Sequence, residues 1–257
     1  MKLEGLVAVI TGSGSGIGLA SALEFAKEGA RVVVADINSH AALETVRLIL
    51  EKGETAVAVE TDVAEADSVR GLVAATLSAF SQIDVLFNNA GIAVCKTIEE
   101  MTIDEWNRQI AVNLGGVFLC SKYFMPYLRK TRGTIINMSS VNSFFVEPTL
   151  AGYCATKSAI TGLTKAMAID HGNEGIRVNC IRPGYVDSGG AQIYFDTQAD
   201  PVAARAAAGK LHPLGRIGRP EEIARVAVFL ASQDASFITG AAVDVTAGFG
   251  MGIAPSS

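Results

Sequence analysis

Short runs of apolar, mostly β-branched residues alternate along the chain with longer amphipathic stretches. Most of the short runs lack polar alternation, as expected for strands that helices cover on both faces. They predict seven strands, at 6–10, 31–35, 56–60, 85–87, 134–138, 177–181 and 242–245. The stretches between them predict helices at 17–28, 41–52, 65–80, 105–128, 153–173 and 221–231. The alternation predicts an α/β fold, a doubly wound parallel seven-stranded sheet with helices on both faces.

The chain reads as one domain over residues 1–257, because no linker, low-complexity tract or fixed-period repeat interrupts the pattern. Of its residues, 49% are hydrophobic and 18% are charged, which indicates a well-buried globular protein and excludes disorder. One region, 185–219, mixes Gly, Asp, Pro and apolar residues without a clear period. We expect an irregular, mobile segment there that covers a substrate.

Charge and cysteine usage exclude several classes of function. The net charge is −5, and the basic residues are scattered apart from a small cluster at Arg129, Lys130 and Arg132, so neither nucleic acid nor an acidic membrane surface is an expected partner. No apolar stretch is long enough to span a membrane, and the run at 6–10 is too short for a signal peptide. The four cysteines form no C-x-x-C pair, so we expect no metal site, no disulfide framework and a cytoplasmic location.

A glycine-rich turn, T-G-x-x-x-G-x-G at residues 11–18, connects the first predicted strand to the first predicted helix. Glycines there let backbone N–H groups and the helix N-terminus approach a pyrophosphate. The context favours a Rossmann-like dinucleotide site, although Ile17 stands where the usual G-x-G-x-x-G has its third glycine. Taken alone, the loop could also be a plain tight turn.

Asp36 ends the second predicted strand, about 20 residues beyond the glycines. A carboxylate at that place accepts hydrogen bonds from both hydroxyls of the adenosine ribose and repels a 2′-phosphate. Neither Ser13 nor Ile37 offers the basic side chain that such a phosphate requires. The sequence therefore favours NAD over NADP. The alternative is that Asp36 is a solvated loop residue with no role in cofactor binding.

Further motifs follow in a fixed order: Asp62-Val63, N-N-A-G at 88–91, Asn113, Ser140, Y-x-x-x-K at 153–157 and Pro183-Gly184. With the glycine-rich turn, this ordered set resembles the short-chain dehydrogenase/reductase family over nearly the whole chain. The resemblance implies an NAD-binding fold and a set of residues that contact the cofactor. These are Gly12, Ser15, Gly16, Ile17, Gly18, Asp36, Asp62, Val63, Asn89, Ala90, Gly91, Tyr153, Lys157, Pro183, Gly184, Val186 and Ser188.

Tyr153 and Lys157 are four residues apart in a predicted helix, so their side chains share one face. A free tyrosine has a pKa of about 10 and is phenolate only about one part in a thousand at pH 7, too little for an efficient general base. Protonated Lys157 and the positive nicotinamide ring both favour the phenolate. Lowering the pKa by about three requires roughly 4 kcal/mol of electrostatic interaction, which two nearby cations can supply.

The resemblance assigns the remaining catalytic roles to Ser140 and Asn113. Ser140 would hold the same substrate oxygen as Tyr153; Ser139 is the alternative, but the family's spacing before the tyrosine selects Ser140. Asn113 would interrupt its helix to hold a water that passes protons from Lys157 to solvent. Taken singly, each residue also has a structural interpretation, such as a buried amide for Asn113.

The expected substrate wall combines 93–96, 141–147 and 185–214. It would bring together Phe144, Phe145, Ile193, Tyr194, Phe195, Leu211, Asn142, Glu147 and His212, although a histidine such as His212 is more often structural. Such a mixed wall could accept a cyclic secondary alcohol, a polyol or an acyl ketone. The resemblance also implies a homotetramer in which the helices containing 106–128 and 153–173 pack across a two-fold axis.

The predicted function is an NAD(H)-dependent oxidoreductase that interconverts a secondary alcohol and a ketone, with Asn113, Ser140, Tyr153 and Lys157 as the catalytic set. Two alternatives stay open. One is an NADPH-dependent 3-oxoacyl-thioester reductase, against which Asp36 counts. The other is a regulatory protein that binds a dinucleotide without turnover, although such proteins usually lose the tyrosine or the lysine.

Overall fold

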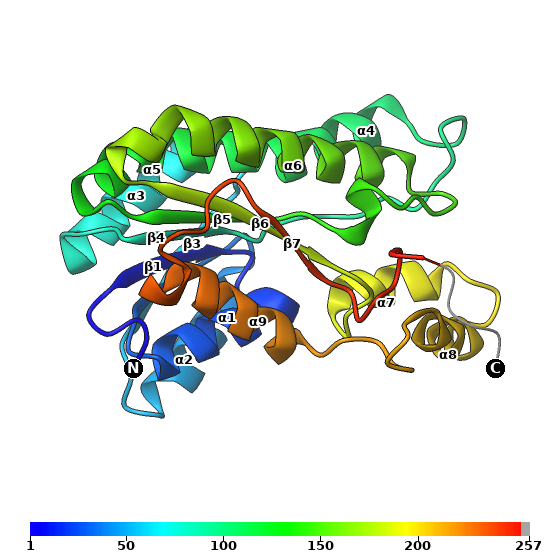
Figure 1. Ribbon diagram of the computed structural model, residues 1–257, viewed down its shortest axis with the longest axis horizontal. Coiled ribbons are helices and arrows are strands. Elements are labelled where there is room, and N and C mark those ends of the chain that lie inside the picture. Colours follow the sequence, from blue (N-terminus) through cyan, green and yellow to red (C-terminus); the bar gives the residue numbers. More distant parts are fainter. Residues whose placement is uncertain (253–257) are drawn as a thin grey trace.

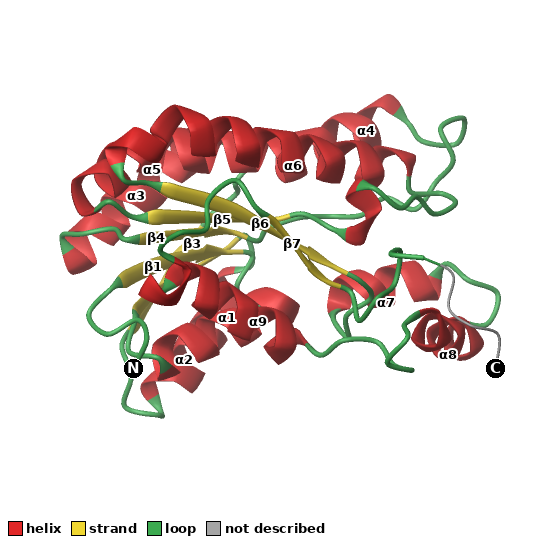
Figure 2. Ribbon diagram, in the orientation of Figure 1, coloured by secondary structure: helices red, strands yellow, loops and turns green. Residues whose placement is uncertain are grey.

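A sheet of seven parallel strands forms the centre of the protein (Figure 2). The computed structural model describes residues 1–252, and the strand order is β3-β2-β1-β4-β5-β6-β7. The strands are β1 (Val7–Thr11), β2 (Arg31–Asp36), β3 (Ala56–Glu60), β4 (Val85–Asn88), β5 (Thr134–Met138), β6 (Arg177–Pro183) and β7 (Ala242–Val245). The predicted α/β fold is confirmed, because every predicted strand is present in one doubly wound sheet.

Helices cover both faces of the sheet (Figure 1). On one face lie α1 (Gly16–Lys27), α2 (Ser39–Leu50) and α9 (Pro220–Ala231), and on the other lie α3 (Ala66–Phe80), α5 (Gly116–Thr131) and α6 (Ala151–His171). Each face has its own apolar core: Phe25 of α1 stacks on Phe87 of β4 in the first, and Leu72 and Phe124 are fully buried in the second. Burial on both faces explains why the strands are continuous apolar runs.

The strand order reverses at β1, which pairs with β2 on one side and with β4 on the other. In a parallel sheet all strands end at one edge, and a crevice opens where the order reverses. The loops that follow β1, β2 and β4 therefore meet at this edge. These loops carry the glycine-rich turn, Asp36 and the N-N-A-G motif.

The helix predicted at 105–128 is continuous but not uniform. It comprises α4 (Ile103–Ile110), a π-helical turn (Ala111–Gly115) and α5. The capping box of Thr102 and Glu105 begins α4 two residues before the predicted start. A π-helical turn often marks a functional position, and Asn113 lies in this one.

The expectation of an irregular segment at 185–219 is wrong for much of its length. The segment contains α7 (Gly189–Asp196) and α8 (Pro201–Leu211), which lie beyond the carboxyl end of the sheet (Figure 1). Asp200 caps α8 by accepting a hydrogen bond from the backbone N–H of Ala203, and Pro201 occupies the first turn. These start signals and the alanine-rich sequence that follows favour a helix even though the segment has no clear apolar period.

Membrane-spanning helices and metal clusters are absent from residues 1–252. No helix in this range is both long enough and apolar enough to cross a membrane. The same residues contain no group of three or more His, Cys, Asp or Glu side chains placed to hold a metal ion. The four cysteines are free thiols: Cys95, Cys120, Cys154 and Cys180.

Candidate active site

The glycine-rich turn lies at the carboxyl end of β1 and is held in place by the N-N-A-G loop. Gly12 and Gly16 have positive φ angles of 63° and 53°, which a residue with a side chain rarely adopts. A Cβ at Gly12 would lie 2.8 Å from the Cα of Ala90. The Asn89 amide donates hydrogen bonds of 2.9 and 3.0 Å to the carbonyl oxygens of Thr11 and Gly12. Asn89 therefore shapes the turn that opens onto the N-terminus of α1.

Gly18 is the position in this turn where a side chain would do most harm. A Cβ there would overlap the carbonyl oxygen of Gly12 and lie 2.6 Å from the Asn89 amide nitrogen. We expect Gly18→Ala to lower the free energy of unfolding by about 1–3 kcal/mol and to weaken NADH binding, measured by urea unfolding and by fluorescence titration. Gly71→Ala is the control: its Cβ meets no atom within 4 Å on the exposed side of α3, so stability should rise by about 0.5–1 kcal/mol. Unchanged NADH affinity in Gly18→Ala would contradict a role for the turn.

Beside the glycine-rich turn, Asp36 accepts a hydrogen bond of 2.8 Å from the backbone N–H of Gly14 and one of 2.9 Å from that of Asn38. Each carboxylate oxygen keeps capacity to accept a further bond. Close by in the wall, Arg108 of α4 pairs with Asp62 at 3.0 Å. No sequence motif identifies Arg108, because its acidic partner lies on a different element.

Ser140, Tyr153 and Lys157 meet at the end of the cleft near β5 and α6. The Lys157 ammonium donates a hydrogen bond of 2.8 Å to the Met138 carbonyl and lies 5.4 Å from the centre of the Tyr153 ring. The structure separates the two serines: the Ser139 hydroxyl is buried and donates to the Lys157 carbonyl at 2.9 Å, within α6. The Ser140 hydroxyl donates to the Asn142 side-chain oxygen at 3.2 Å, and Ser140 lowers the pKa of Tyr153.

Asn113 lies behind this group, fully buried, and does not itself line the cleft. Its side-chain oxygen accepts a hydrogen bond of 2.8 Å from the backbone N–H of Ile92, and its amide nitrogen donates to the Ile92 carbonyl at 2.9 Å and to Thr156 at 3.2 Å. Asn113 therefore ties the π-helical turn to α6 and to the loop after β4. Both its side-chain oxygen and the Lys157 ammonium lie close to Gly91.

In the protein without cofactor, burial shifts the pKa values of both Tyr153 and Lys157 toward their neutral forms. Burial raises the pKa of Tyr153 to about 12, and the interaction with Ser140 only partly opposes this. Burial also lowers the pKa of Lys157 to about 8, so the lysine is still mostly protonated at pH 7. The cost of desolvating the phenolate exceeds the one interaction that lowers this pKa, the hydrogen bond with Ser140. The protein alone therefore keeps Tyr153 as a neutral phenol.

The buried Lys157 should make stability depend on pH. Because its pKa is about 8 in the folded chain and 10.5 in the unfolded one, the unfolded chain binds more protons between these values, and unfolding free energy rises with pH. We expect Lys157 to contribute a gain of about 2 kcal/mol between pH 8 and pH 10, measured by urea unfolding as the difference between the pH profiles of wild type and Lys157→Met. Buried thiols such as Cys120, whose pKa is raised, lower stability over the same range, but they do so equally in both proteins. Lys122→Met, at an exposed lysine, should keep the wild-type profile. Parallel profiles of wild type and Lys157→Met would contradict the burial of a charged lysine.

All residues predicted to contact the cofactor line one cleft of about 420 Å³. They are Gly12, Ser15, Gly16, Ile17, Gly18, Asp36, Asp62, Val63, Asn89, Ala90, Gly91, Tyr153, Lys157, Pro183, Gly184, Val186 and Ser188. The wall also includes residues that no sequence signal identified, among them Thr61, Leu150 and the Gly189-Gly190 pair that begins α7. The cleft runs from Asp36 past the N-terminus of α1 to Tyr153, so its two ends differ in chemistry.

The expected substrate wall is only partly correct. Asn142, Glu147 and Tyr194 line the cleft, together with Ala93 and Tyr185. The prediction is wrong for Phe144, Phe145, Ile193, Phe195, Leu211 and His212, which lie outside it. Phe195 is buried against the far side of Tyr185, with ring centres 5.4 Å apart. His212 is structural, since its ring bonds the Ala208 carbonyl at 2.8 Å and accepts from the Tyr185 N–H at 3.2 Å.

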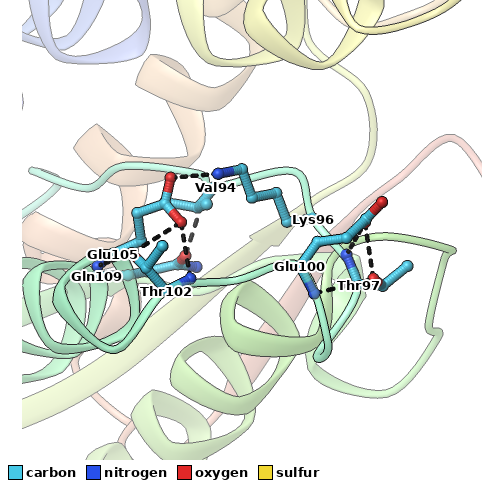
Figure 3. A network of polar contacts seen from close by, with 7 residues as sticks. All are labelled: Val94, Lys96, Thr97, Glu100, Thr102, Glu105 and Gln109. Atoms are coloured by element: carbon cyan, nitrogen blue, oxygen red, sulfur yellow. Dashed lines mark hydrogen bonds and ion pairs between the residues drawn. The ribbon is translucent and has the colours of Figure 1, made fainter.

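The loop that carries Ala93 is fastened to α4 by polar contacts (Figure 3). The Lys96 ammonium donates to Glu105 at 2.6 Å, and the backbone N–H of Val94 donates to Gln109 at 3.3 Å. The Lys96 contact and the backbone N–H of Thr102 hold the pKa of Glu105 down at about 2, so this contact is ionic at neutral pH. The contacts fix the loop beside the catalytic end of the cleft.

The features of the cleft fit a nicotinamide dinucleotide. The glycine cradle has no room for a Cβ at Gly12 or Gly18, and it opens at a helix N-terminus, where backbone N–H groups favour a phosphate. Asp36 offers acceptors for ribose hydroxyls at one end. At the other end, Ser140 and Tyr153 present two hydroxyls, side by side, to a reacting oxygen. This arrangement suits proton exchange with an alcohol or a carbonyl group.

Known proteins resemble the chain over almost its full length. A family model described as enoyl-(acyl carrier protein) reductase matches residues 12–250. The meso-2,3-butanediol dehydrogenase of Serratia marcescens is 41% identical over 96% of this chain and 96% of its own. The cyclohexanol dehydrogenase of Acinetobacter sp. (strain SE19) is 41% identical over 93% and 92%.

Among solved structures, the 3-ketoacyl-(acyl-carrier-protein) reductase of Brucella melitensis, crystallised with NADH, superimposes with a TM-score of 0.89. It is 35% identical, and the match covers 96% of this chain and 99% of the other. The two relatives and the solved structure match 93–96% of this chain. Together with the cleft, they identify the chain as a member of the short-chain dehydrogenase/reductase family, an oxidoreductase that acts on CH–OH groups.

Proposed function

We propose that the protein is an NAD(H)-dependent oxidoreductase that interconverts a secondary alcohol and a ketone. The observation that carries the proposal is that one cleft contains two kinds of site. At one end Asp36 can accept hydrogen bonds from ribose hydroxyls, and at the other Ser140, Tyr153 and Lys157 can exchange a proton with a substrate. The names of the two relatives that act on butanediol and cyclohexanol support the same reaction type.

In the oxidation direction, Tyr153 takes the proton of the substrate hydroxyl. The Ser140 hydroxyl, which donates to the Asn142 side-chain oxygen in the structure, turns to donate a hydrogen bond to the same substrate oxygen. Bound NAD⁺ supplies the hydride acceptor and a positive ring. That charge, added to protonated Lys157, offsets the burial that raises the pKa of Tyr153. In reduction, Tyr153 returns the proton to the carbonyl oxygen.

Lys157 and Asn113 support this proton exchange. Lys157 is held by the Met138 carbonyl, so its ammonium stays below the Tyr153 ring, where it also binds the nicotinamide ribose. Asn113 holds the water that passes protons from Lys157 to solvent. The shared proximity of Asn113 and Lys157 to Gly91 supports this path.

NAD is the proposed cofactor because Asp36 faces the place where a 2′-phosphate would lie. Of the described residues in the cleft wall, the basic ones are Arg108, which is paired with Asp62, and Lys157, at the catalytic end. Neither is free to bind a phosphate beside Asp36. This counts against an NADPH-dependent 3-oxoacyl-thioester reductase, although the family model and the Brucella melitensis protein carry acyl-carrier names. The intact catalytic set counts against a regulatory protein without turnover.

The proposal includes the organisation of the chain: one domain with 185–219 as the segment that covers the substrate. Tyr185 and Tyr194 of that segment lie in the cleft wall.

The proposal also includes a homotetramer, in which α5 and α6 pack across a two-fold axis. Phe118 of α5 and Ile169 of α6 support this, with exposed fractions of 52% and 84%. A cytoplasmic location accords with the four free cysteines.

The test is NADH formation from NAD⁺ over a panel of secondary alcohols, including cyclic alcohols, polyols and hydroxyacyl thioesters, with Tyr153→Phe as the matched blank. Turnover with an alcohol that disappears in Tyr153→Phe is the expected result. Turnover restricted to hydroxyacyl thioesters with NADP⁺ would favour the acyl reductase instead. NAD binding without turnover of any alcohol would favour the regulatory protein.

A further inference from the structure

A carboxylate stands in the cleft wall close to the catalytic serine. Glu147 is half-buried and lines the same cleft as Ser140 and Tyr153. One of its oxygens accepts a hydrogen bond of 2.6 Å from the Tyr185 hydroxyl, and the other accepts one of 3.0 Å from the Asn142 amide. The Asn142 oxygen in turn accepts a hydrogen bond of 3.2 Å from the Ser140 hydroxyl. A single amide group therefore links Glu147 to the catalytic serine.

The surroundings hold this carboxylate rigidly. The Tyr185 ring packs among Tyr194, Phe195 and Phe249, with ring centres 5.4 to 5.8 Å apart. Burial and the neighbouring carboxylate raise the pKa of the Tyr185 hydroxyl, so it remains a donor throughout the neutral range. Asn142 is 6% exposed, and its amide also donates to the Phe145 carbonyl at 3.1 Å. Glu147 is therefore oriented by two fixed donors from two different loops.

The carboxylate still has acceptor capacity to offer a ligand. Its two oxygens have about four lone-pair sites, of which the two protein donors use two. An ionised carboxylate has no proton to donate, so a ligand group that pairs with it must be a donor. In an alcohol or a ketone that contains only carbon, hydrogen and oxygen, a second hydroxyl meets that requirement.

We propose that Glu147 binds a second hydroxyl of the substrate, so that the preferred substrates are diols or hydroxyketones rather than simple alcohols. This inference rests on the proposed function, because the first hydroxyl is the one that Ser140 and Tyr153 hold. Ser140 and Glu147 lie close together, because each forms a hydrogen bond with the same Asn142 side chain. The second hydroxyl therefore lies only a few carbons from the reacting one.

Other ligand groups suit the site less well. An ammonium group would also pair with Glu147, but it would share the cleft with protonated Lys157. An unbranched acyl chain would leave the carboxylate desolvated without a partner, which is costly. A purely structural role, in which Glu147 only ties the 141–147 loop to Tyr185, predicts no preference between a diol and the matched mono-alcohol.

The test compares cyclohexane-1,2-diol with cyclohexanol, and propane-1,2-diol with propan-2-ol, as NAD⁺-linked substrates. Wild type should have the higher kcat/KM for each diol. Glu147→Gln keeps the shape, removes the charge and replaces one of the two acceptor oxygens with a donor NH2 group. It should lower the ratio of diol to mono-alcohol kcat/KM by about tenfold or more, mainly through KM of the diol. Glu99→Gln removes the same charge from an exposed residue outside the cleft and should keep the wild-type ratio.

A second readout does not depend on turnover. In the presence of NADH, cyclohexane-1,2-diol should raise the Tm of wild type more than cyclohexanol does, and Glu147→Gln should abolish the difference. A ratio of kcat/KM that Glu147→Gln leaves unchanged overturns the inference while mono-alcohol turnover keeps the proposed function. Absence of turnover with all four alcohols overturns the proposed function, and equal Tm shifts for the two cyclohexane compounds then overturn the inference as well.

Discussion

Replacing Tyr153 with phenylalanine is expected to lower kcat/KM for a secondary alcohol by about a thousandfold, within the range that general acid–base catalysis contributes. The substitution removes the hydroxyl that exchanges the proton and keeps the ring, which packs over the Lys157 ammonium at 5.4 Å. The cleft and its glycine turn are untouched, so NADH affinity should change little. Steady-state kinetics and a fluorescence titration measure the two effects separately.

Two controls sharpen this prediction. Tyr127→Phe removes a hydroxyl from a half-buried tyrosine of α5, outside the cleft, and should leave kcat/KM near the wild-type value. Ser140→Ala should lower kcat/KM less than Tyr153→Phe does, because Ser140 holds the substrate oxygen but does not exchange its proton. If Tyr153→Phe kept wild-type kcat/KM, another group would have to be the acid and base.

Replacing Asp36 with alanine is expected to change the preference for NAD over NADP by about a thousandfold, measured as the ratio of kcat/KM for the two cofactors. Losing hydrogen bonds to a charged acceptor costs about 1.5–3 kcal/mol, or roughly ten- to a hundredfold with NAD⁺. Removing the carboxylate also relieves its repulsion of a 2′-phosphate, which is worth several kcal/mol at close range. The two effects act in the same direction on the ratio.

Asp36→Asn separates charge from shape. The amide oxygen can still accept the hydrogen bond of the Gly14 N–H, so the glycine turn should keep its conformation. NADP⁺ use should therefore rise in Asp36→Asn with less loss of NAD⁺ use than in Asp36→Ala. An unchanged preference in both variants would contradict the role of Asp36 in cofactor choice.

The sheet was predictable from the sequence because strands that are buried on both faces have a recognisable pattern. Each is a continuous run of Val, Ile and Ala between amphipathic stretches. The residues of the cofactor cleft were predictable because they follow strand ends, and parallel strands end at one edge of a sheet. Motif spacing placed Tyr153 and Lys157 on one helix face, and the structure brings them together with Ser140.

Other features could not be predicted, because they depend on contacts between distant segments that no local sequence pattern reports. The hydrogen bond from Tyr185 to Glu147 joins two loops, and the ion pair of Arg108 with Asp62 joins α4 to the loop after β3. The raised pKa of Tyr153 follows from desolvation, which residue spacing does not report. The aromatic residues predicted for the wall were misplaced for the same reason: a mixed segment such as 185–214 does not reveal which of its side chains face the cleft.

The most direct test of the proposed reaction follows one hydrogen atom. A secondary alcohol that carries deuterium on its carbinol carbon is oxidised with NAD⁺ by wild type and by Tyr153→Phe, and the reduced cofactor is analysed by mass spectrometry. We expect wild type to form NADH carrying the deuterium and Tyr153→Phe to form almost none. NADH without the deuterium, or equal formation of deuterated NADH by both proteins, would contradict hydride transfer from the alcohol with Tyr153 as its acid and base.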